Sequence, residues 1–235
     1  MGIIIRKDGR KYYIKERMDS IFAPQEWLLF YHQLKGEKQK LTFNCLINTG
    51  ARISEISNVK IKDINFEKEQ ILLRITKGRF SKKNSMVSNF CDRKPRKIPI
   101  SSSFCGYLKK YIRIKKLSSE DFIGLLSIPA ANIAMKKALI KAKIKNYRDF
   151  SIHNIRKTLE NWLMGIGVQD MKLLKHFGHN KNTAIKYYLF QQPLSKIEKD
   201  KISSVIGNLY KGDGNIDILY DKIYALENKL KLWVS

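Results

Sequence analysis

The chain has 235 residues, of which 43% are hydrophobic and 29% charged, enough for one globular domain with a small appendage. Its formal charge of +25 favours a polyanion, DNA or RNA, as the partner, although a lysine bias of the genome is an alternative source of that charge. The sequence also argues against several classes. No apolar run reaches the length of a membrane span, the first residues do not resemble a signal peptide, and the three cysteines lack disulfide or zinc-site spacing. We therefore expect an intracellular protein that lies close to nucleic acid.

The N-terminal part predicts a hairpin and a first helix. Residues 3–5 and 12–14 flank the turn signal Asp8-Gly9, a pattern typical of a short β-hairpin. Pro24 is suited to the first turn of a helix, which we expect to end near Gly36.

A second helix and a strand pair follow. Residues 39–48 predict a helix that ends at Gly50, since glycine readily adopts the left-handed conformation that closes helices. Residues 70–76 place apolar side chains at every second position, which indicates a strand. After a basic, serine-rich insertion over 78–96, residues 96–100 are expected to return as the partner strand, and their proline indicates an edge position.

Two further helices are expected in the second half of the chain. Residues 129–145 place lysines at helical spacing, on what we interpret as a solvated face. Ser151 is suited to cap a helix over 152–164, whose apolar residues form one buried stripe. His153 and Arg156 border that stripe on the helical projection, so a rigid helix edge would hold both at a fixed geometry.

The last part of the chain is typical of a helical tail. We expect a helix over 195–209, a break at Gly212-Asp213-Gly214 and a final helix. From Ile216 to Trp233 the apolar residues of the final helix follow each other in steps of three and four, as in a heptad seam. This seam packs either onto its own domain or onto a partner.

These elements predict a mainly α fold with a small antiparallel β-sheet, which is an α+β class. The prediction follows from long helical patterns beside only short strand patterns. We divide the chain into a hairpin-like extension over 1–19, a main domain over 20–194 and a helical tail over 195–235.

One ordered set of motifs carries the expected chemistry. Arg52 lies in the segment TGARISE, and further along the chain His153 precedes Arg156 by three positions. Gly178-His179 and then Tyr187-Tyr188 complete the set. No single motif is specific, but their order is.

These residue types suit the cleavage of a phosphodiester without a metal. Arg52 and Arg156 fit the role of charge stabilisation, because a planar guanidinium pairs with two phosphate oxygens and keeps its charge. His153 shares a helix edge with Arg156, and an imidazole ordinarily titrates near neutrality, which suits proton transfer.

The ordered set resembles the catalytic domain of the tyrosine recombinases, the phage-integrase and Xer-type enzymes that cut and rejoin DNA. The resemblance covers residues from about 38 to about 190. It implies that the domain over 20–194 has this fold, that Arg52 and Arg156 hold the scissile phosphate, and that His153 assists the acid and base steps.

The resemblance implies two further site residues. His179 would bind the phosphate or position the nucleophile, whereas His176, about one turn earlier, is interpreted as structural. Lys77, at the end of the predicted strand, would protonate the leaving 5′ oxygen. Lys82 and Lys83 lie in the same loop and are alternatives for that role.

The nucleophile implied by the resemblance is a tyrosine that forms a 3′-phosphotyrosine. In the family the nucleophile commonly follows the Gly-His histidine by nine positions, which gives Tyr188. Counting from Thr183 instead favours Tyr187. We predict Tyr188, with Tyr187 as the alternative.

The resemblance further implies double-stranded DNA as substrate, no cofactor and no metal, and a homo-oligomer, a tetramer on paired DNA sites. The protein would act in the cytoplasm near the nucleoid, or in the host cell of a virus or plasmid. Typical members carry a separate helical DNA-binding domain before the first arginine, but only 51 residues precede Arg52. We therefore expect either a fragment or a minimal enzyme.

Three functions fit these observations. A site-specific recombinase or integrase is favoured by the Gly-His motif and the heptad-bearing tail. A type IB topoisomerase-like enzyme would relax supercoils with similar chemistry. A DNA-binding regulator with an inactive site is the third, and the intact set of motifs argues against it.

Overall fold

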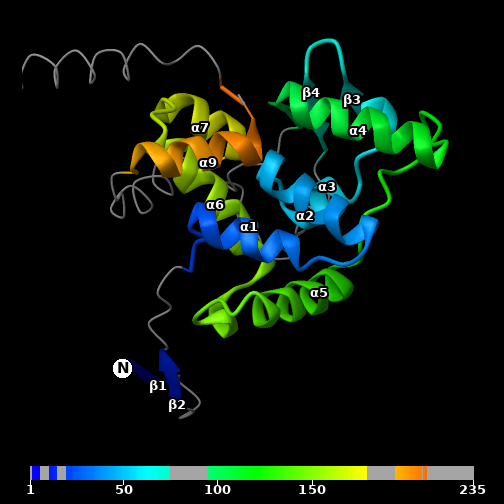
Figure 1. Ribbon diagram of the computed structural model, residues 1–235. Helices are drawn as coiled ribbons and strands as arrows, with labels where there is room; N and C mark the ends of the chain where they lie inside the picture. The colour runs from blue at the N-terminus through cyan, green and yellow to red at the C-terminus, as the bar shows by residue number, and fades with distance from the viewer. Residues whose placement is uncertain are drawn as a thin grey trace, which may run out of the picture.

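The computed structural model describes residues 2–5, 11–14, 20–74, 95–178, 194–207 and 209–210. The described residues form a mainly helical structure with small antiparallel sheets, as the sequence predicts (Figure 1). One sheet is the predicted N-terminal hairpin, in which β1 (Gly2–Ile5) pairs with β2 (Lys11–Ile14).

A three-stranded sheet has the order β3-β4-β5, with β3 (Ile64–Asn65), β4 (Gln70–Leu73) and β5 (Arg96–Pro99). Ile71 of β4 lies opposite Ile98 of β5, and both side chains are fully buried, so one face of this sheet belongs to the core. Within the described sheet β5 lies at the edge, where its proline costs no ladder hydrogen bond.

Two helices form the centre of the fold. Helix α2 (Glu37–Thr49) packs on α6 (Ile152–Gly165), and both bury most of their side chains. Helix α1 (Pro24–His32) contacts α5 (Ile128–Lys141) and α9 (Lys196–Ile206), which lie below and above it in Figure 1.

Shorter elements surround this centre. Helix α3 (Ile53–Ile56) follows α2 directly, and α4 (Ser102–Lys115) follows the sheet. Helix α7 (Asp170–Phe177) contacts both α6 and β5, and therefore joins the helical centre to the sheet. The 3-10 turns η1 (Ile61–Asp63) and η3 (Tyr147–Asp149) complete the described elements.

An aromatic cluster fixes the segment before α1 against α6. The ring of Phe22 lies 5.4 Å from that of Trp27 and 5.2 Å from that of Phe30. The Phe22 backbone N–H donates to Thr158 Oγ1 at 3.0 Å, and Trp162 Nε1 donates to the Phe22 carbonyl at 3.0 Å. The buried polar atoms of this cluster thus have partners, as a packed core requires.

Several element ends differ from the predicted ones. Helix α1 ends at His32 rather than near Gly36. Helix α5 ends at Lys141 rather than at residue 145, because Lys143 takes a positive φ angle of 54°, which a right-handed helix does not allow.

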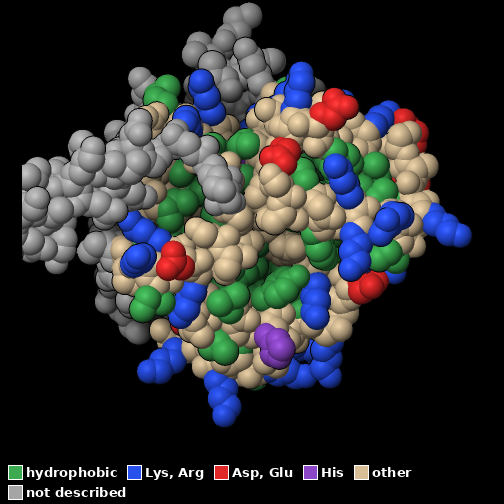
Figure 2. Space-filling view, turned by 45° about the horizontal axis from the view of Figure 1, so that its top comes forward, with side chains coloured by type: hydrophobic (Ala, Val, Ile, Leu, Met, Phe, Trp, Pro, Cys, Tyr) green, Lys and Arg blue, Asp and Glu red, His purple; other side chains and the backbone are tan. Residues whose placement is uncertain are grey.

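Charged side chains are scattered over the face of the molecule that Figure 2 shows. On the face in Figure 2, lysine and arginine side chains outnumber acidic ones and are spread around its edge. Lys136 and Lys137 of α5 are exposed, as predicted for a solvated face. Among the helices of the described ranges, none is long and apolar enough to cross a membrane.

Candidate active site

The site is built on a tight turn between α2 and α3, residues 49–52, which we call the arginine turn. Helix α2 ends as Gly50 takes a left-handed φ of 57° and donates its N–H to the Leu46 carbonyl at 2.9 Å. A Cβ atom at Gly50 would lie 2.5 Å from Phe177 Cε1 and 2.9 Å from Leu159 Cδ2. Conformation and packing therefore both require glycine, which confirms the predicted helix end.

Arg52 follows at the start of α3 and is held by Glu55. The Glu55 carboxylate accepts a hydrogen bond from the Arg52 backbone N–H at 2.9 Å and another from Nη1 at 2.9 Å. The Arg52 side chain is still 51% exposed, whereas that of Glu55 is only 9% exposed. Glu55 thus orients Arg52 from the buried side and leaves its guanidinium accessible to an anion.

Arg96 is a part of the site that the sequence patterns did not reveal. Its Nη2 donates to Glu55 Oε2 at 2.8 Å and its Nη1 to Oε1 at 3.2 Å, while its Nε donates to the His176 carbonyl at 3.1 Å. One sequence signal could have found it: Arg96 lies two residues before Ile98, which is fully buried, on the same face of a strand. A cation on a buried strand face needs a partner.

The charges around Glu55 keep it ionised. Burial by itself would raise the pKa of the Glu55 carboxyl, but the hydrogen bonds and charges of Arg96 and Arg52 outweigh this and lower its pKa to about 2. The carboxylate therefore remains an acceptor for both arginines at any physiological pH.

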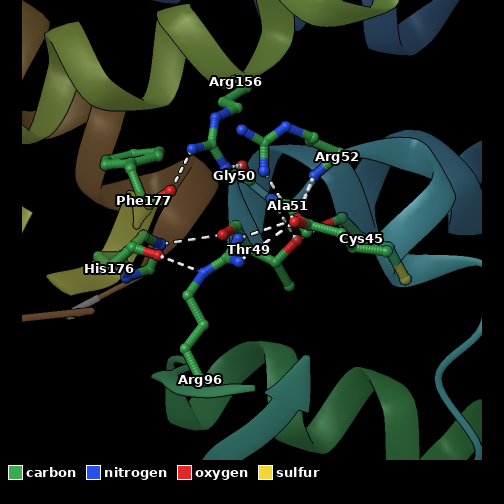
Figure 3. A network of polar contacts seen from close by, with 10 residues as sticks. Cys45, Thr49, Gly50, Ala51, Arg52, Arg96, Arg156, His176 and Phe177 are labelled. Carbon is green, nitrogen blue, oxygen red and sulfur yellow. Dashed lines mark hydrogen bonds and ion pairs between the residues drawn. The ribbon is translucent and has the colours of Figure 1, made fainter. Parts of the chain in front are cut away.

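Arg156 lies inside the fold rather than along a helix edge. Its side chain comes from α6, and the residue is only 3% exposed. Nη1 donates to the Gly50 carbonyl at 2.8 Å, and Nη2 donates to the Phe177 carbonyl, while the guanidinium lies 5.0 Å from the centre of the Phe177 ring (Figure 3). Arg156 thus ties the arginine turn to the end of α7.

Burial lowers the pKa of Arg156, and the nearby charges of Arg52 and Arg96 lower it further, to about 10. The group still carries its proton at neutral pH. Glu160, one turn further along α6, acts in the opposite direction. Three arginines and two carboxylates, Glu55 and Glu160, leave an excess of positive charge that favours an anion at this position.

Three of the predicted site residues lie among the described residues, and the structure brings two of them, Arg52 and Arg156, together. His153 and Arg156 lie one turn apart on α6, with His153 exposed, and Arg156 contacts the turn that carries Arg52. The other predicted residues, Lys77, His179 and Tyr188 with its alternative Tyr187, lie outside the described residues.

Helix α7 ends at Phe177, two residues before the predicted His179 in the sequence. Gly178 closes the helix with a left-handed φ of 61°, and a Cβ atom there would lie 3.5 Å from Arg96 Cδ. The predicted structural role of His176 is confirmed, because its ring is buried and bonded on both sides, to the Thr49 carbonyl and to the Tyr210 hydroxyl. Within the described ranges no cluster of histidine, cysteine or acidic residues is suited to hold a metal ion.

The chain belongs to the phage integrase family, whose model matches residues 22–193. This assignment covers the main domain, including all the predicted catalytic positions. It agrees with the order of the motifs and with the observed fold.

Curated relatives carry recombinase descriptions. A protein of Acholeplasma phage L2, described as a probable integrase/recombinase, is 26% identical over 167 residues, 68% of this chain and 53% of its own length. A tyrosine recombinase of Pseudothermotoga lettingae is 23% identical over 181 residues, 75% of this chain and 58% of its own length. The chain therefore spans little more than half the length of these relatives.

Solved structures share the fold at low sequence identity. The catalytic domain of bacteriophage HP1 integrase is 17% identical with a TM-score of 0.52, and the match covers 83% of this chain and 98% of that domain. The Tn1549 transposon integrase in complex with transposon right end DNA is 18% identical with a TM-score of 0.58, over 78% of this chain and 64% of that one. The fold is thus that of tyrosine recombinase catalytic domains.

Proposed function

We propose that this chain is the catalytic part of a site-specific DNA recombinase or integrase that cuts and rejoins DNA through a 3′-phosphotyrosine. The observation that carries the proposal is the contact between Arg156 and the arginine turn. This contact places the buried guanidinium of Arg156 against the turn that presents the half-exposed Arg52. Such an arrangement suits a phosphate whose charge grows in the transition state.

The proposed roles follow from these positions. Arg52 holds the non-bridging oxygens of the scissile phosphate. Arg156 supplies positive charge from the buried side of the arginine turn and fixes this turn, which presents Arg52. His153, exposed on the first turn of α6, assists proton transfer. His179, the residue after Gly178 in the sequence, is proposed to bond the same phosphate.

The reaction is an exchange of one phosphodiester for another. The hydroxyl of Tyr188 gives its proton to His153 and attacks the phosphorus, and the bond between phosphorus and the 5′ oxygen breaks. Lys77 gives a proton to that leaving oxygen. Attack by a 5′ hydroxyl on the phosphotyrosine reverses these steps and rejoins the strand, so no metal or external energy source is needed.

The proposed partner is double-stranded DNA, and the proposed assembly is a homotetramer on paired sites. The excess positive charge supports the first, and the heptad pattern of the predicted last helix supports the second. The reaction would take place in the cytoplasm, on the nucleoid or on the DNA of a virus or plasmid.

A covalent adduct tests this function. The protein is incubated with a nicked or phosphorothiolate-containing copy of its attachment site, found by sequencing the DNA that flanks the gene for repeats. We expect an adduct that survives denaturation and is lost in Tyr188→Phe, while Tyr187→Phe retains it. Absence of any adduct with the wild type would favour the inactive regulator, and relaxation of supercoils without a specific site would favour a topoisomerase.

A further inference from the structure

His176 occupies an unusual position beside the arginine turn. Its ring lies in the last turn of α7, only 2% exposed, and neither of its nitrogens faces solvent. Nε2 lies 2.9 Å from the Thr49 carbonyl oxygen, and Nδ1 lies 2.8 Å from the Tyr210 hydroxyl. The imidazole thus bridges the end of α2 and the residues that follow α9.

The bond directions can be derived from the chemistry of the partners. A carbonyl oxygen only accepts, so Nε2 must carry the proton that it gives to Thr49. Burial, together with the charges of Arg156 and Arg96, lowers the pKa of His176 to about 3, although the bond to Thr49 acts in the opposite direction. The ring is therefore neutral, its Nδ1 carries no proton, and the Tyr210 hydroxyl must be the donor to Nδ1.

Tyr210 is itself held in place by the segment that carries it. Gly207 combines a φ of 61° with a ψ of −156°, a conformation essentially restricted to glycine. A Cβ atom there would lie 2.6 Å from Ser103 Oγ and 2.9 Å from Ser101 Oγ, so this segment packs tightly at the start of α4. Leu209, one residue before Tyr210, is only 7% exposed.

The contacts of His176 converge on the arginine turn from two sides. Its ring holds the carbonyl of Thr49, the residue before Gly50. Its own carbonyl accepts from Arg96, whose guanidinium fixes Glu55 and, through Glu55, Arg52. A change at the His176 ring therefore acts on the position of Arg52 without contact between His176 and the substrate.

We propose that Tyr210 and His176 are positioning residues that form a relay from the segment after α9 to the arginine turn. The Tyr210 hydroxyl fixes the tautomer and orientation of the imidazole, the imidazole fixes the Thr49 carbonyl, and this sets the position of Arg52. The relay rests on the proposed function for its effect on DNA cleavage. Its geometry does not depend on that function.

The principal test is Tyr210→Phe in the full chain, with Tyr147→Phe as the matched control. Tyr147 is also half-buried and lies in η3, outside the site, where its hydroxyl accepts from the exposed Arg148. We expect Tyr210→Phe to slow adduct formation at saturating DNA by a factor of about two to ten, the contribution of one neutral hydrogen bond, with the dissociation constant for DNA unchanged. The control should cleave like the wild type.

Side-chain ¹⁵N spectra report which ring nitrogen of His176 carries the proton. A merely structural Tyr210 would not affect this readout. In the wild type, Nε2 of His176 should carry the proton and Nδ1 should not. In Tyr210→Phe the Nδ1 resonance should shift because its donor is gone, and the amide resonances of Gly50 and Arg52 should shift with it. A protonated Nδ1 in the wild type would overturn the relay, as would an unchanged cleavage rate in Tyr210→Phe.

His176→Gln tests whether Tyr210 acts through the His176 ring, and it keeps the hydrogen bond to Thr49 so that the fold is preserved. The amide of glutamine reaches the position of Nε2 and still donates to Thr49, but it has no group at the position of Nδ1. The relay predicts that Tyr210→Phe has no further effect on the cleavage rate in a His176→Gln background. Additive effects of the two substitutions would contradict it.

The relay and the proposed function can fail separately. A wild type that forms no adduct would refute the proposed function, and the relay would then be judged by the ¹⁵N and amide shifts alone. A wild type that cleaves, beside a Tyr210→Phe variant with unchanged rate and spectra, would refute only the relay.

Discussion

Arg96 holds both carboxylate oxygens of Glu55, with Nη2 at 2.8 Å from Oε2 and Nη1 at 3.2 Å from Oε1. The same carboxylate accepts from Arg52, so one buried acid orients an arginine from the sheet and an arginine of the candidate site. The sheet therefore takes part in placing Arg52, although Arg52 itself lies at the start of a short helix.

Replacing Glu55 by glutamine is expected to destabilise the protein by about 1–3 kcal/mol, because hydrogen bonds to a charged acceptor are lost next to two arginines. The rate of DNA cleavage should fall by a larger factor than the affinity for DNA. Urea unfolding and single-turnover cleavage measure the two effects. Glu67→Gln, which changes an exposed carboxylate, is the control, and equal stability of the two variants would contradict the role of Glu55.

Arg96→Lys tests whether charge alone suffices at this position. An ammonium group cannot pair with both oxygens of Glu55 and reach the His176 carbonyl at once, so we expect a loss of about 1–2 kcal/mol and slower cleavage. Lys97→Ala on the same strand changes an exposed side chain and should alter stability little. A fully active and stable Arg96→Lys protein would show that the planar guanidinium is not needed.

Gly50→Ala is expected to destabilise the protein by about 2–4 kcal/mol, since the new Cβ adds strain at a left-handed φ and would overlap Phe177 and Leu159. Gly106→Ala is a matched control inside α4, where a Cβ meets nothing within 4 Å and alanine should stabilise the helix by about 0.5–1 kcal/mol. Thermal unfolding of both variants distinguishes the two environments. Similar unfolding temperatures would contradict the close packing of the arginine turn.

The sequence predicts the helices and strands of this fold better than it predicts the side-chain contacts between them. The end of α2 at Gly50 follows from local chemistry alone, and the β4 and β5 strands follow from alternation. The helical projection gave Arg156 its angle at the border of the stripe, but it could not indicate what packs against that border. The partners of Arg156 are carbonyls 106 and 21 residues away along the chain.

The same limit applies to Arg96 and His176. The contacts of Arg96 with Glu55 and His176 span 41 and 80 residues, and no local pattern encodes them. The sequence indicated a structural role for His176 but not its partners, because Thr49 and Tyr210 come from distant elements. By contrast, the contact between Arg52 and Glu55 is local in the sequence, since these residues are only three positions apart.

Acid should destabilise the protein in two stages. The pKa of His176 is lowered by burial from its ordinary value of 6.5 to about 3, so the unfolded chain takes up a proton before the folded one as the pH falls. Stability should therefore decrease below pH 6.5, by at most about 1.4 kcal/mol per pH unit for this one group. Glu55, with a pKa lowered from 4.5 to about 2, adds a second loss below pH 4.5.

Urea unfolding of wild type and His176→Gln between pH 7.5 and pH 5, about the range of histidine titration, measures the first stage. The variant should lose less stability over this range than the wild type. Arg156 and Arg96 are the charged groups that face His176, and Arg156, with a pKa of about 10, keeps its proton over this range. Parallel curves for the two proteins would contradict a neutral, buried His176.

The covalent bond between DNA and a tyrosine is the central claim. Mass spectrometry of the peptides from a trapped adduct, formed on the attachment site and digested with nuclease, tests it most directly. We predict a nucleotide on Tyr188 through a 3′ phosphate, and a loss of the adduct by about a hundredfold or more in Arg52→Ala. A modified residue other than Tyr188 or Tyr187, or an adduct that forms equally well without Arg52, would contradict the account.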